Sequence, residues 1–257
     1  MRSGISPIRI AALGLTNSMS DLTRKPSSYR KMRSDMEHDL TLWGAGTSRT
    51  MRPHWMLLEL GLEYEFAPIG SRTGETQTDE FRLLNPRHKI PVLRHGQFVL
   101  TESAAIIQYL SETFANPAQV YVPGDSTDRA RLNEWCYFAI SELDAGSLYV
   151  MRRHEGLKQI YGEAPVAVEA AKNYFIQNLE AMASRVGAGD PYLLGDRFSA
   201  ADILLMTCLD WAASIGIPLS EAYTHYRNRV GRRPAYRAAL ERNFSELQTA
   251  DRKESSK

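Results

Sequence analysis

Cysteine is scarce in this chain, because only Cys136 and Cys208 occur among its 257 residues. Two cysteines are too few for a disulfide framework, and their spacing is not that of a metal site. The six histidines are scattered, with no pair at metal-ligand spacing, so we expect no metal. A reduced, cytoplasmic compartment is the expected location.

Long apolar runs and a large charge excess are also missing. The best apolar run, Ile203–Leu209, has seven residues, whereas a membrane span needs roughly 18. The formal net charge of +1 gives no general attraction to nucleic acid or to an anionic membrane. Hydrophobic residues at 43% and charged residues at 24% are typical of a globular protein. We therefore expect a folded protein that binds neither nucleic acid nor membrane.

The charge is unevenly distributed along the chain. Residues 1–35 contain seven basic and two acidic side chains, a net +5, whereas the rest contains 24 basic and 28 acidic, a net −4. The first segment is also rich in serine and lacks periodicity, which predicts a disordered basic extension. Two alternatives stay open: an organelle transit peptide, or an upstream start with the working chain opening at Met36.

The segment from residue 36 to residue 116 has the pattern of a small α/β domain. His38–Trp43 and Tyr64–Ala67 are strand-like, and Arg49–Leu60 between them has helical spacing that ends at a glycine. This order predicts a parallel βαβ unit. The other elements predicted here are a helix over Asp79–Leu84, strands over Ile90–Leu93 and Gln97–Leu100, and a helix over Glu102–Phe114.

Strand signals vanish after a Pro- and Gly-containing linker over residues 117–126. An all-helical domain is predicted over residues 127–247, followed by a polar tail over 248–257. Its helices are expected at Thr127–His154, Pro165–Val186, Ser199–Ala213, Leu219–Arg229 and Pro234–Leu247. The fold class is therefore α/β followed by all-α.

Three hydroxyls, Thr47, Ser48 and Thr50, lie in the turn between the first strand and the first helix. Together with free backbone N–H groups at a positive helix end, they suit an anion such as a thiolate. Ordinary helix capping explains the same residues equally simply.

Two further motifs have a similar double interpretation. Pro91 at the start of a strand is either a plain trans proline or a cis proline that leaves the backbone of Ile90 free to pair with a peptide. Glu102 and Ser103 at a helix start either cap the helix or hold an amino acid's ammonium and carboxylate. Ser199 and Asp202, by contrast, form a capping-box pattern that we interpret as structural.

The chain from about His38 to Leu247 resembles the cytosolic glutathione transferases, in particular their bacterial-like members with a serine or threonine. The resemblance rests on three blocks in order: TLWGAGTSRTMRPHWMLLELGLEYE, LNPRHKIPVLRHGQFVLTESAAIIQYL and YLLGDRFSAADILL. It implies a thioredoxin-like domain followed by a helical domain, in a homodimer that uses glutathione as co-substrate and serves detoxification. Residues 1–35 match nothing in the family.

The resemblance also implies roles for single residues. Ile90 would pair its backbone with the cysteinyl part of glutathione beside a cis Pro91, and Glu102 and Ser103 would hold the γ-glutamyl end. The glycyl carboxylate would lie near His88 and Lys89. The hydroxyl turn would face the sulfur, and because the family places its catalytic residue variably here, we rank Ser48 first, Thr47 second and Thr50 third.

The expected reaction is the attack of a glutathione thiolate on a small apolar electrophile. That substrate is expected between the domains, with Tyr137, Tyr149, Met151 and Trp211 as wall residues, although core packing also explains most of these. The first domain has no cysteine, which argues against thiol exchange. The alternatives are a non-enzymatic interaction or ligand-carrying module, and a glutathione-dependent isomerase, dehalogenase or ether-cleaving enzyme.

Overall fold

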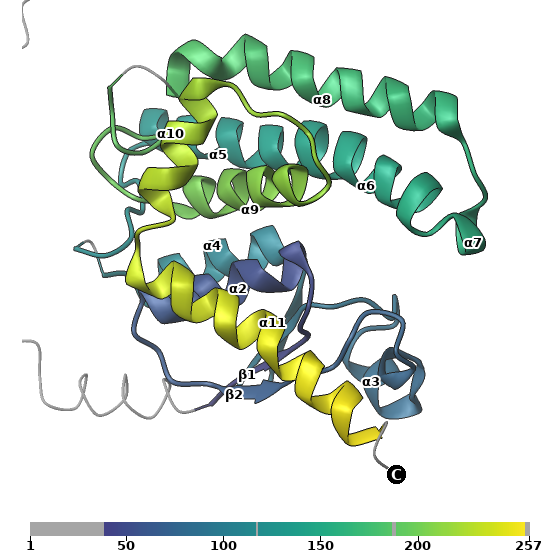
Figure 1. Ribbon diagram of the computed structural model, residues 1–257. Coiled ribbons are helices and arrows are strands. Elements are labelled where there is room, and N and C mark those ends of the chain that lie inside the picture. The colour runs from purple at the N-terminus through teal and green to yellow at the C-terminus, as the bar shows by residue number, and fades with distance from the viewer. Residues whose placement is uncertain (1–38, 117, 187–188, 255–257) are drawn as a thin grey trace, which may run out of the picture. The chain divides into compact units, whose positions relative to one another are not determined.

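The computed structural model describes residues 39–116, 118–186 and 189–254 (Figure 1). The predicted basic extension over residues 1–35 lies outside these residues. The first domain contains a four-stranded sheet in the order β2-β1-β3-β4, with β2 parallel to β1 and the other neighbours antiparallel. Its elements in chain order are β1 (Leu40–Trp43), α2 (Ser48–Glu59), β2 (Glu65–Ala67), η1 (Glu75–Gln77), α3 (Asp79–Leu84), β3 (Val92–His95), β4 (Phe98–Thr101) and α4 (Ser103–Thr113).

This topology confirms the predicted parallel βαβ unit and the thioredoxin-like first domain. Thr41 of β1 pairs with Glu65 of β2, and Trp43 pairs with Val92 of β3. Strand β3 begins two residues later than predicted, after Pro91, because proline has no N–H to donate to a sheet ladder. The short helix η1 was not predicted.

The second domain is helical throughout the part that the structure describes. After the linker, its elements are α5 (Ser126–Tyr137), η2 (Phe138–Leu148), α6 (Tyr149–Met151), η3 (Arg152–Gly156), α7 (Lys158–Tyr161), α8 (Pro165–Val186), α9 (Ala200–Ser214), α10 (Glu221–Val230) and α11 (Pro234–Glu254). The predicted helices over Asp79–Leu84 and Pro165–Val186 match α3 and α8 residue for residue.

The long helix predicted over Thr127–His154 is not a regular α-helix, because η2 and η3 are π-helical. Two small residues explain the wide turn in η2. The Ser147 hydroxyl donates to the Glu142 carbonyl five residues earlier, at 2.6 Å. A Cβ on Gly146 would lie 2.8 Å from the Ser141 carbonyl oxygen, so a larger residue would crowd this turn. Such π-turns are frequent at functional sites.

At the other end of the chain, α11 continues to Glu254, beyond the predicted end at Leu247 and into the segment expected to be a polar tail. This helix returns to the first domain and packs along α2 (Figure 1). No helix within the described residues is long and apolar enough to cross a membrane.

A single hydrophobic core joins the two domains. Helices α2 and α4 pack against each other and against α9, between the sheet and the helical domain (Figure 1). Trp55 of α2 and Trp135 of α5 are both buried in this core, and α9 is buried along nearly its whole length. The start of α2 is thereby held rigidly between the sheet, α9 and α11.

Candidate functional site

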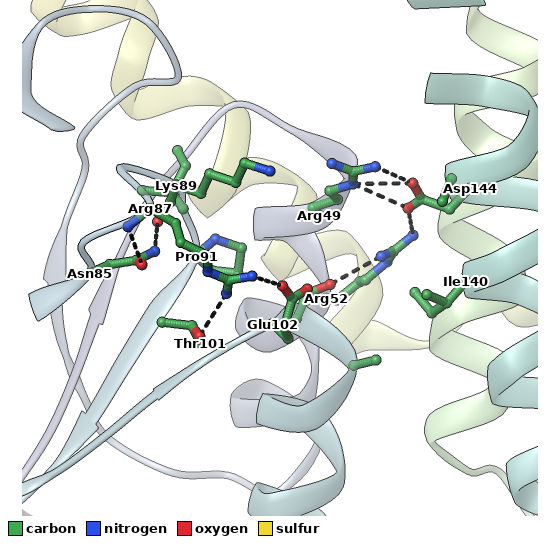
Figure 2. A pocket seen from close by; sticks show the side chains of 14 residues that line it. Arg49, Arg52, Asn85, Arg87, Lys89, Pro91, Thr101, Glu102, Ile140 and Asp144 are labelled. Atoms are coloured by element: carbon green, nitrogen blue, oxygen red, sulfur yellow. Dashed lines mark hydrogen bonds and ion pairs between the residues drawn. The ribbon is translucent and has the colours of Figure 1, made fainter. Parts of the chain in front are cut away.

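A pocket of about 160 Å³ opens where the first domain faces the π-helical stretch η2 (Figure 2). Its walls come from the first turn of α2, the loop before β3, the junction of β4 with α4, and η2. The lining residues are Arg49, Arg52, Asn85, Arg87, Lys89, Ile90, Pro91, Thr101, Glu102, Ser103, Ala104, Ile140, Asp144 and Ala145.

Five of the residues that the resemblance assigned to glutathione lie together in this pocket. They are Lys89, Ile90, Pro91, Glu102 and Ser103. The Ile90–Pro91 peptide bond is cis, as the resemblance implies. His88 does not line the pocket: its Nδ1 lies 2.9 Å from the Thr76 carbonyl. The hydroxyls of Thr47, Ser48 and Thr50 are not among the lining groups either, although the next residue of their turn, Arg49, is.

The loop before β3 is fastened by the buried Asn85. Its amide donates to the Lys89 carbonyl at 2.7 Å, and its oxygen accepts from the Arg87 backbone N–H at 3.0 Å. Arg87 in turn donates to the Glu102 carboxylate at 2.7 Å and to the Thr101 hydroxyl at 2.9 Å. This chain of hydrogen bonds ties the loop to the β4–α4 junction and fixes the outer wall of the pocket.

Glu102 occupies an uncommon backbone conformation, with a φ of 70°. A non-glycine residue at positive φ is strained and is held there only by its surroundings. This conformation begins α4 directly after β4 and brings the exposed Glu102 carboxylate and the buried Ser103 hydroxyl to the same pocket. The strain thus coincides with the residues predicted to hold an amino-acid group.

Arg52, Arg49 and Asp144 form the inner wall (Figure 2). Arg52 donates to Asp144 at 2.6 Å and to the Ser103 hydroxyl at 3.0 Å, and its Nε donates to Thr207 of α9 at 2.9 Å. Arg49 donates to Asp144 at 2.5 Å. Asp144 therefore binds two guanidinium groups near the N-terminus of α2.

The pKa of Asp144 reflects these two cations. Burial by itself raises its pKa, but the charges and hydrogen bonds of Arg52 and Arg49 outweigh burial and bring its pKa below the usual value. For Arg49, burial lowers the pKa, and the hydrogen bond and charge of Asp144 turn the net shift upward. Asp144 and Arg49 are therefore both charged at neutral pH.

The three candidate hydroxyls differ in their hydrogen-bond partners. Thr47 caps α2: its oxygen accepts from the Thr50 N–H at 3.0 Å, and the Thr50 hydroxyl accepts from the Thr47 N–H at 3.0 Å. The buried Thr50 hydroxyl also lies 2.8 Å from the side-chain oxygen of Asn243 in α11. The hydroxyl of the half-buried Ser48 has no hydrogen-bond partner within the part of the chain that the structure describes.

The four predicted wall residues are scattered. None of them lines the pocket. Tyr149 lies beside it, because the guanidinium carbon of Arg49 is 4.3 Å from the centre of the Tyr149 ring. Tyr137 is 65% exposed, Met151 is buried in the core, and Trp211 packs against the core.

The structural pair Ser199 and Asp202 forms the capping box at the start of α9. The Asp202 carboxylate accepts from the Ser199 N–H at 2.8 Å, and it also accepts from the Leu193 N–H and the Tyr226 hydroxyl. These bonds lower the pKa of Asp202, but its burial outweighs them and raises it. The carboxylate belongs to the interior of the helical domain and lies away from the pocket lining.

Sequence reasoning missed the inner wall of the pocket. Arg52 lies within the buried stretch of α2, and Asp144 is buried in η2. A buried charge needs a partner, and the two signs are complementary. The sequence shows charges in both segments, but it does not say which acid meets which base. Asn243, which fastens the turn of Thr47, carries no signal at all.

The two cysteines are both buried, and burial raises the pKa of each thiol to about 12. Their thiolate population at neutral pH is therefore negligible. Within the described residues no group of three or more metal-ligating side chains is present.

Fold and pocket together define a two-domain protein with a thioredoxin-like ligand-binding domain. Residues 38–112 match the family model "Glutathione S-transferase, N-terminal domain", and residues 165–248 match "Glutathione S-transferase, C-terminal domain". The two matches together cover more than half of the chain. The chain therefore belongs to the glutathione S-transferase family.

Individual relatives agree with this assignment. Glutathione S-transferase D7 of Drosophila melanogaster is 28% identical over 190 residues, which is 74% of this chain and 81% of the relative. Mouse glutathione S-transferase theta-3 is 28% identical over 165 residues, 63% of this chain and 68% of the relative. A solved theta-class enzyme of Xanthomonas axonopodis pv. citri with glutathione bound is 27% identical, with a TM-score of 0.65 over 80% of this chain and 97% of that one.

Proposed function

We propose that this protein is a glutathione transferase that binds glutathione in the pocket of Figure 2 and conjugates it, through its sulfur, to a small electrophile with an apolar body. One observation carries the proposal: a single pocket gathers Ile90 beside cis Pro91, the Glu102 carboxylate and the Ser103 hydroxyl. These are the groups that a γ-glutamyl-cysteinyl peptide requires.

The two ends of glutathione have matching partners in the proposal. Glu102 takes the γ-glutamyl ammonium, and Ser103 donates to the neighbouring carboxylate. Ser103 already accepts a hydrogen bond from Arg52, so its own proton stays free for that carboxylate. Lys89 is exposed and forms no ion pair among the described residues, so its ammonium is available to the glycyl carboxylate. His88 is adjacent to it.

Activation of the thiol is assigned to the first turn of α2, with Ser48 as the donor. A free thiol with a pKa of about 8.5 is only about 3% ionised at pH 7. A decrease of two pKa units makes the thiol about three-quarters ionised and requires roughly 2.7 kcal/mol of stabilisation of the thiolate. A hydrogen bond from a hydroxyl and a positive helix end together contribute a stabilisation of that order. Ser48 is favoured because Thr47 and Thr50 already bond each other.

In the proposed reaction, one bond forms and one bond breaks. The thiolate sulfur forms a bond to the electrophilic carbon, the leaving group departs with the bonding electron pair, and the thiol proton passes to solvent. Tyr149 is the predicted wall residue that contacts the pocket lining, through Arg49. We assign it to the second-substrate side of the site.

We further propose a homodimer that works in the cytoplasm in detoxification. The exposed apolar side chains Leu83, Phe98 and Val99 on α3 and β4 support a subunit contact on the first domain. Light scattering after size exclusion tests it, and a mass of 29 kDa rather than twice that value would contradict it.

Calorimetric titration with glutathione, followed by conjugation of chlorodinitrobenzene, tests the activity. We expect one glutathione site per chain and a conjugation rate well above the uncatalysed one. Binding without conjugation of any electrophile in a panel would favour the ligand-carrying alternative. Absence of binding would overturn the assignment of the pocket.

A further inference from the structure

Three arginines from separate segments are linked through two tyrosine rings next to the pocket, and a fourth precedes one of them in the chain. Arg49 is in α2, Arg72 is in the loop after β2, and Arg152 and Arg153 are in η3. We call these four residues the arginine cluster. Two tyrosine rings, Tyr149 and Tyr161, lie among them.

Arg49, Arg153 and Arg72 alternate with the two tyrosine rings in a row. The Arg49 and Arg153 guanidinium carbons lie 4.3 and 5.3 Å from the centre of the Tyr149 ring. Arg153 is also 4.9 Å from the Tyr161 ring, and Arg72 is 5.8 Å from it. The Arg72 guanidinium donates to the Tyr161 hydroxyl at 3.2 Å. Ring faces thus hold the cations side by side.

Carboxylates do not balance this charge. Arg49 pairs with Asp144, but that carboxylate is shared with Arg52. Arg72, Arg152 and Arg153 form no ion pair with any residue in the described ranges. Glu163, just after α7, pairs with Lys158, and Glu155 of η3 forms no ion pair with these arginines among the described residues.

The pKa shifts within the cluster differ. Burial lowers the pKa of Arg72, but its hydrogen bonds with Tyr161 and Tyr149 outweigh burial and raise it. Burial lowers the pKa of Arg152, and the like charges of Arg72 and Arg49 lower it further. The hydrogen bond from Arg72 lowers the pKa of the Tyr161 hydroxyl, against the smaller opposing effect of desolvation. A group of cations held this closely repels itself and favours an anion beside it.

The position of the cluster connects it to the reaction. Arg49 belongs both to the row and to the pocket lining, and Tyr149 lies directly against it. A ligand that contacts the pocket on the side of Tyr149 therefore meets the cluster. Guanidinium groups bind carboxylates through paired N–H donors and stack on flat rings.

We propose that the arginine cluster binds the carboxylate of the second substrate, which is an aromatic acid with an electrophilic carbon. The reaction in this proposal rests on the proposed function, whereas the binding surface is inferred from the geometry of the cluster alone. With a chlorodinitrobenzoate, the thiolate sulfur bonds to the ring carbon bearing chlorine, and chloride leaves with the bonding pair. The thiol proton passes to solvent, and the carboxylate stays unchanged in the row.

Binding is measured first, without any reaction. Dinitrobenzoate and the neutral dinitrobenzamide, which share one ring, are titrated calorimetrically into the full chain. We expect the acid to bind at least about tenfold more tightly, which corresponds to about 1.4 kcal/mol. This preference should weaken in high salt. It should vanish in Arg152→Gln/Arg153→Gln and in Arg72→Gln, the latter changing an exposed loop residue.

The matched control is Arg237→Gln, which removes the same charge from an exposed position on α11. It should keep the full preference. Equal affinities of acid and amide in the wild-type chain would overturn the proposal, as would loss of the preference in Arg237→Gln, which would indicate an unspecific charge effect. Far-ultraviolet circular dichroism confirms that each variant is folded.

Conjugation separates this inference from the proposed function. The catalysed rates for chlorodinitrobenzene and its carboxylate analogue are each divided by the uncatalysed rate. A higher ratio for the acid supports the inference, and equal ratios overturn it while the transferase assignment stands. If neither compound is conjugated although the acid still binds selectively, the transferase assignment fails and the anion site stands.

Discussion

Arg52 and Asp144 form an ion pair at 2.6 Å in which each side chain is no more than 2% exposed. Arg52 is on the first helix of the thioredoxin-like domain, and Asp144 is on the π-helical stretch of the helical domain. The same guanidinium reaches Ser103, and the same carboxylate reaches Arg49. One buried pair therefore links the two domains at the pocket.

Removal of one partner of this pair should be costly. Asp144→Asn leaves the Arg52 charge buried without compensation, and we expect a loss of about 3–5 kcal/mol in the free energy of unfolding. The matched control is Glu134→Gln, which breaks exposed pairs with Arg131 and Arg185 and should cost less than about 1 kcal/mol. Urea denaturation measures both. Equal losses would show that the buried pair has no special importance.

The same pair predicts a dependence of stability on pH. The pKa of Asp144 in the folded protein lies below its ordinary value of 3.8, so its contribution is complete above that value and is lost as the pH falls through the folded pKa. The stability difference between wild type and Asp144→Asn should therefore shrink below about pH 4. Denaturation series between neutral and acidic pH test this. A difference that stays constant would contradict a depressed pKa.

Glutathione affinity should depend on Glu102. Glu102→Ala removes the proposed partner of the γ-glutamyl ammonium and should weaken binding by about 1.5–3 kcal/mol, the range for hydrogen bonds to charged groups. Glu112→Ala, an exposed acid on α4, is the control and should leave affinity unchanged. Calorimetric titration is the measurement. Unchanged affinity in a folded Glu102→Ala protein would remove this residue from the site.

The ionisation of bound glutathione should depend on Ser48. Ser48→Ala should raise the thiol pKa by about one to two units and leave affinity nearly intact, because in the proposed mechanism the hydroxyl contacts only the sulfur. Thr50→Ala should lower stability without moving that pKa, since the Thr50 hydroxyl is bonded to Thr47 and Asn243. Thiolate absorbance against pH measures the shift.

The alanine series at 47, 48 and 50 also discriminates between mechanisms. A shift in Thr47→Ala but not in Ser48→Ala would reverse the ranking and keep the hydroxyl mechanism. If none of the three variants shifts the pKa, backbone N–H groups at the start of α2 become the better explanation.

The native protein should be inert to thiol reagents. Burial raises the pKa of both Cys136 and Cys208 to about 12, so iodoacetamide at neutral pH should label neither in the folded state. Both should react after unfolding in urea. Rapid labelling of the folded protein, detected by mass, would contradict this and would reopen a role for a protein thiol.

Local rules explain which parts of the fold were predictable. The helices Asp79–Leu84 and Pro165–Val186 have clear start and stop residues, so their bounds follow from the chain itself. The long helix over Thr127–His154 was predicted correctly as helical, but not its π-turns. Those turns depend on how small residues such as Gly146 pack, which periodicity does not report.

The residues of the candidate site were also predictable only in part. Ile90, Pro91, Glu102 and Ser103 stand at strand and helix ends, where sequence signals are strong, and the structure brings them into one pocket. None of the predicted wall residues lines this pocket, and apolar residues on a helix face serve core and pocket alike. Met151 is an example, since it is buried in the core.

The sequence by itself determined the order of the main elements, the proline at the start of a strand and the family, because these depend on neighbours along the chain. Only the tertiary structure decided that Asp144 meets Arg52, that Asn243 fastens Thr50, and that Arg72 reaches Tyr161. In each case the partners are 89 or more residues apart. The sequence around a charged or amide side chain contains no pattern that identifies a distant partner. Only the packing of the helices brings such groups together.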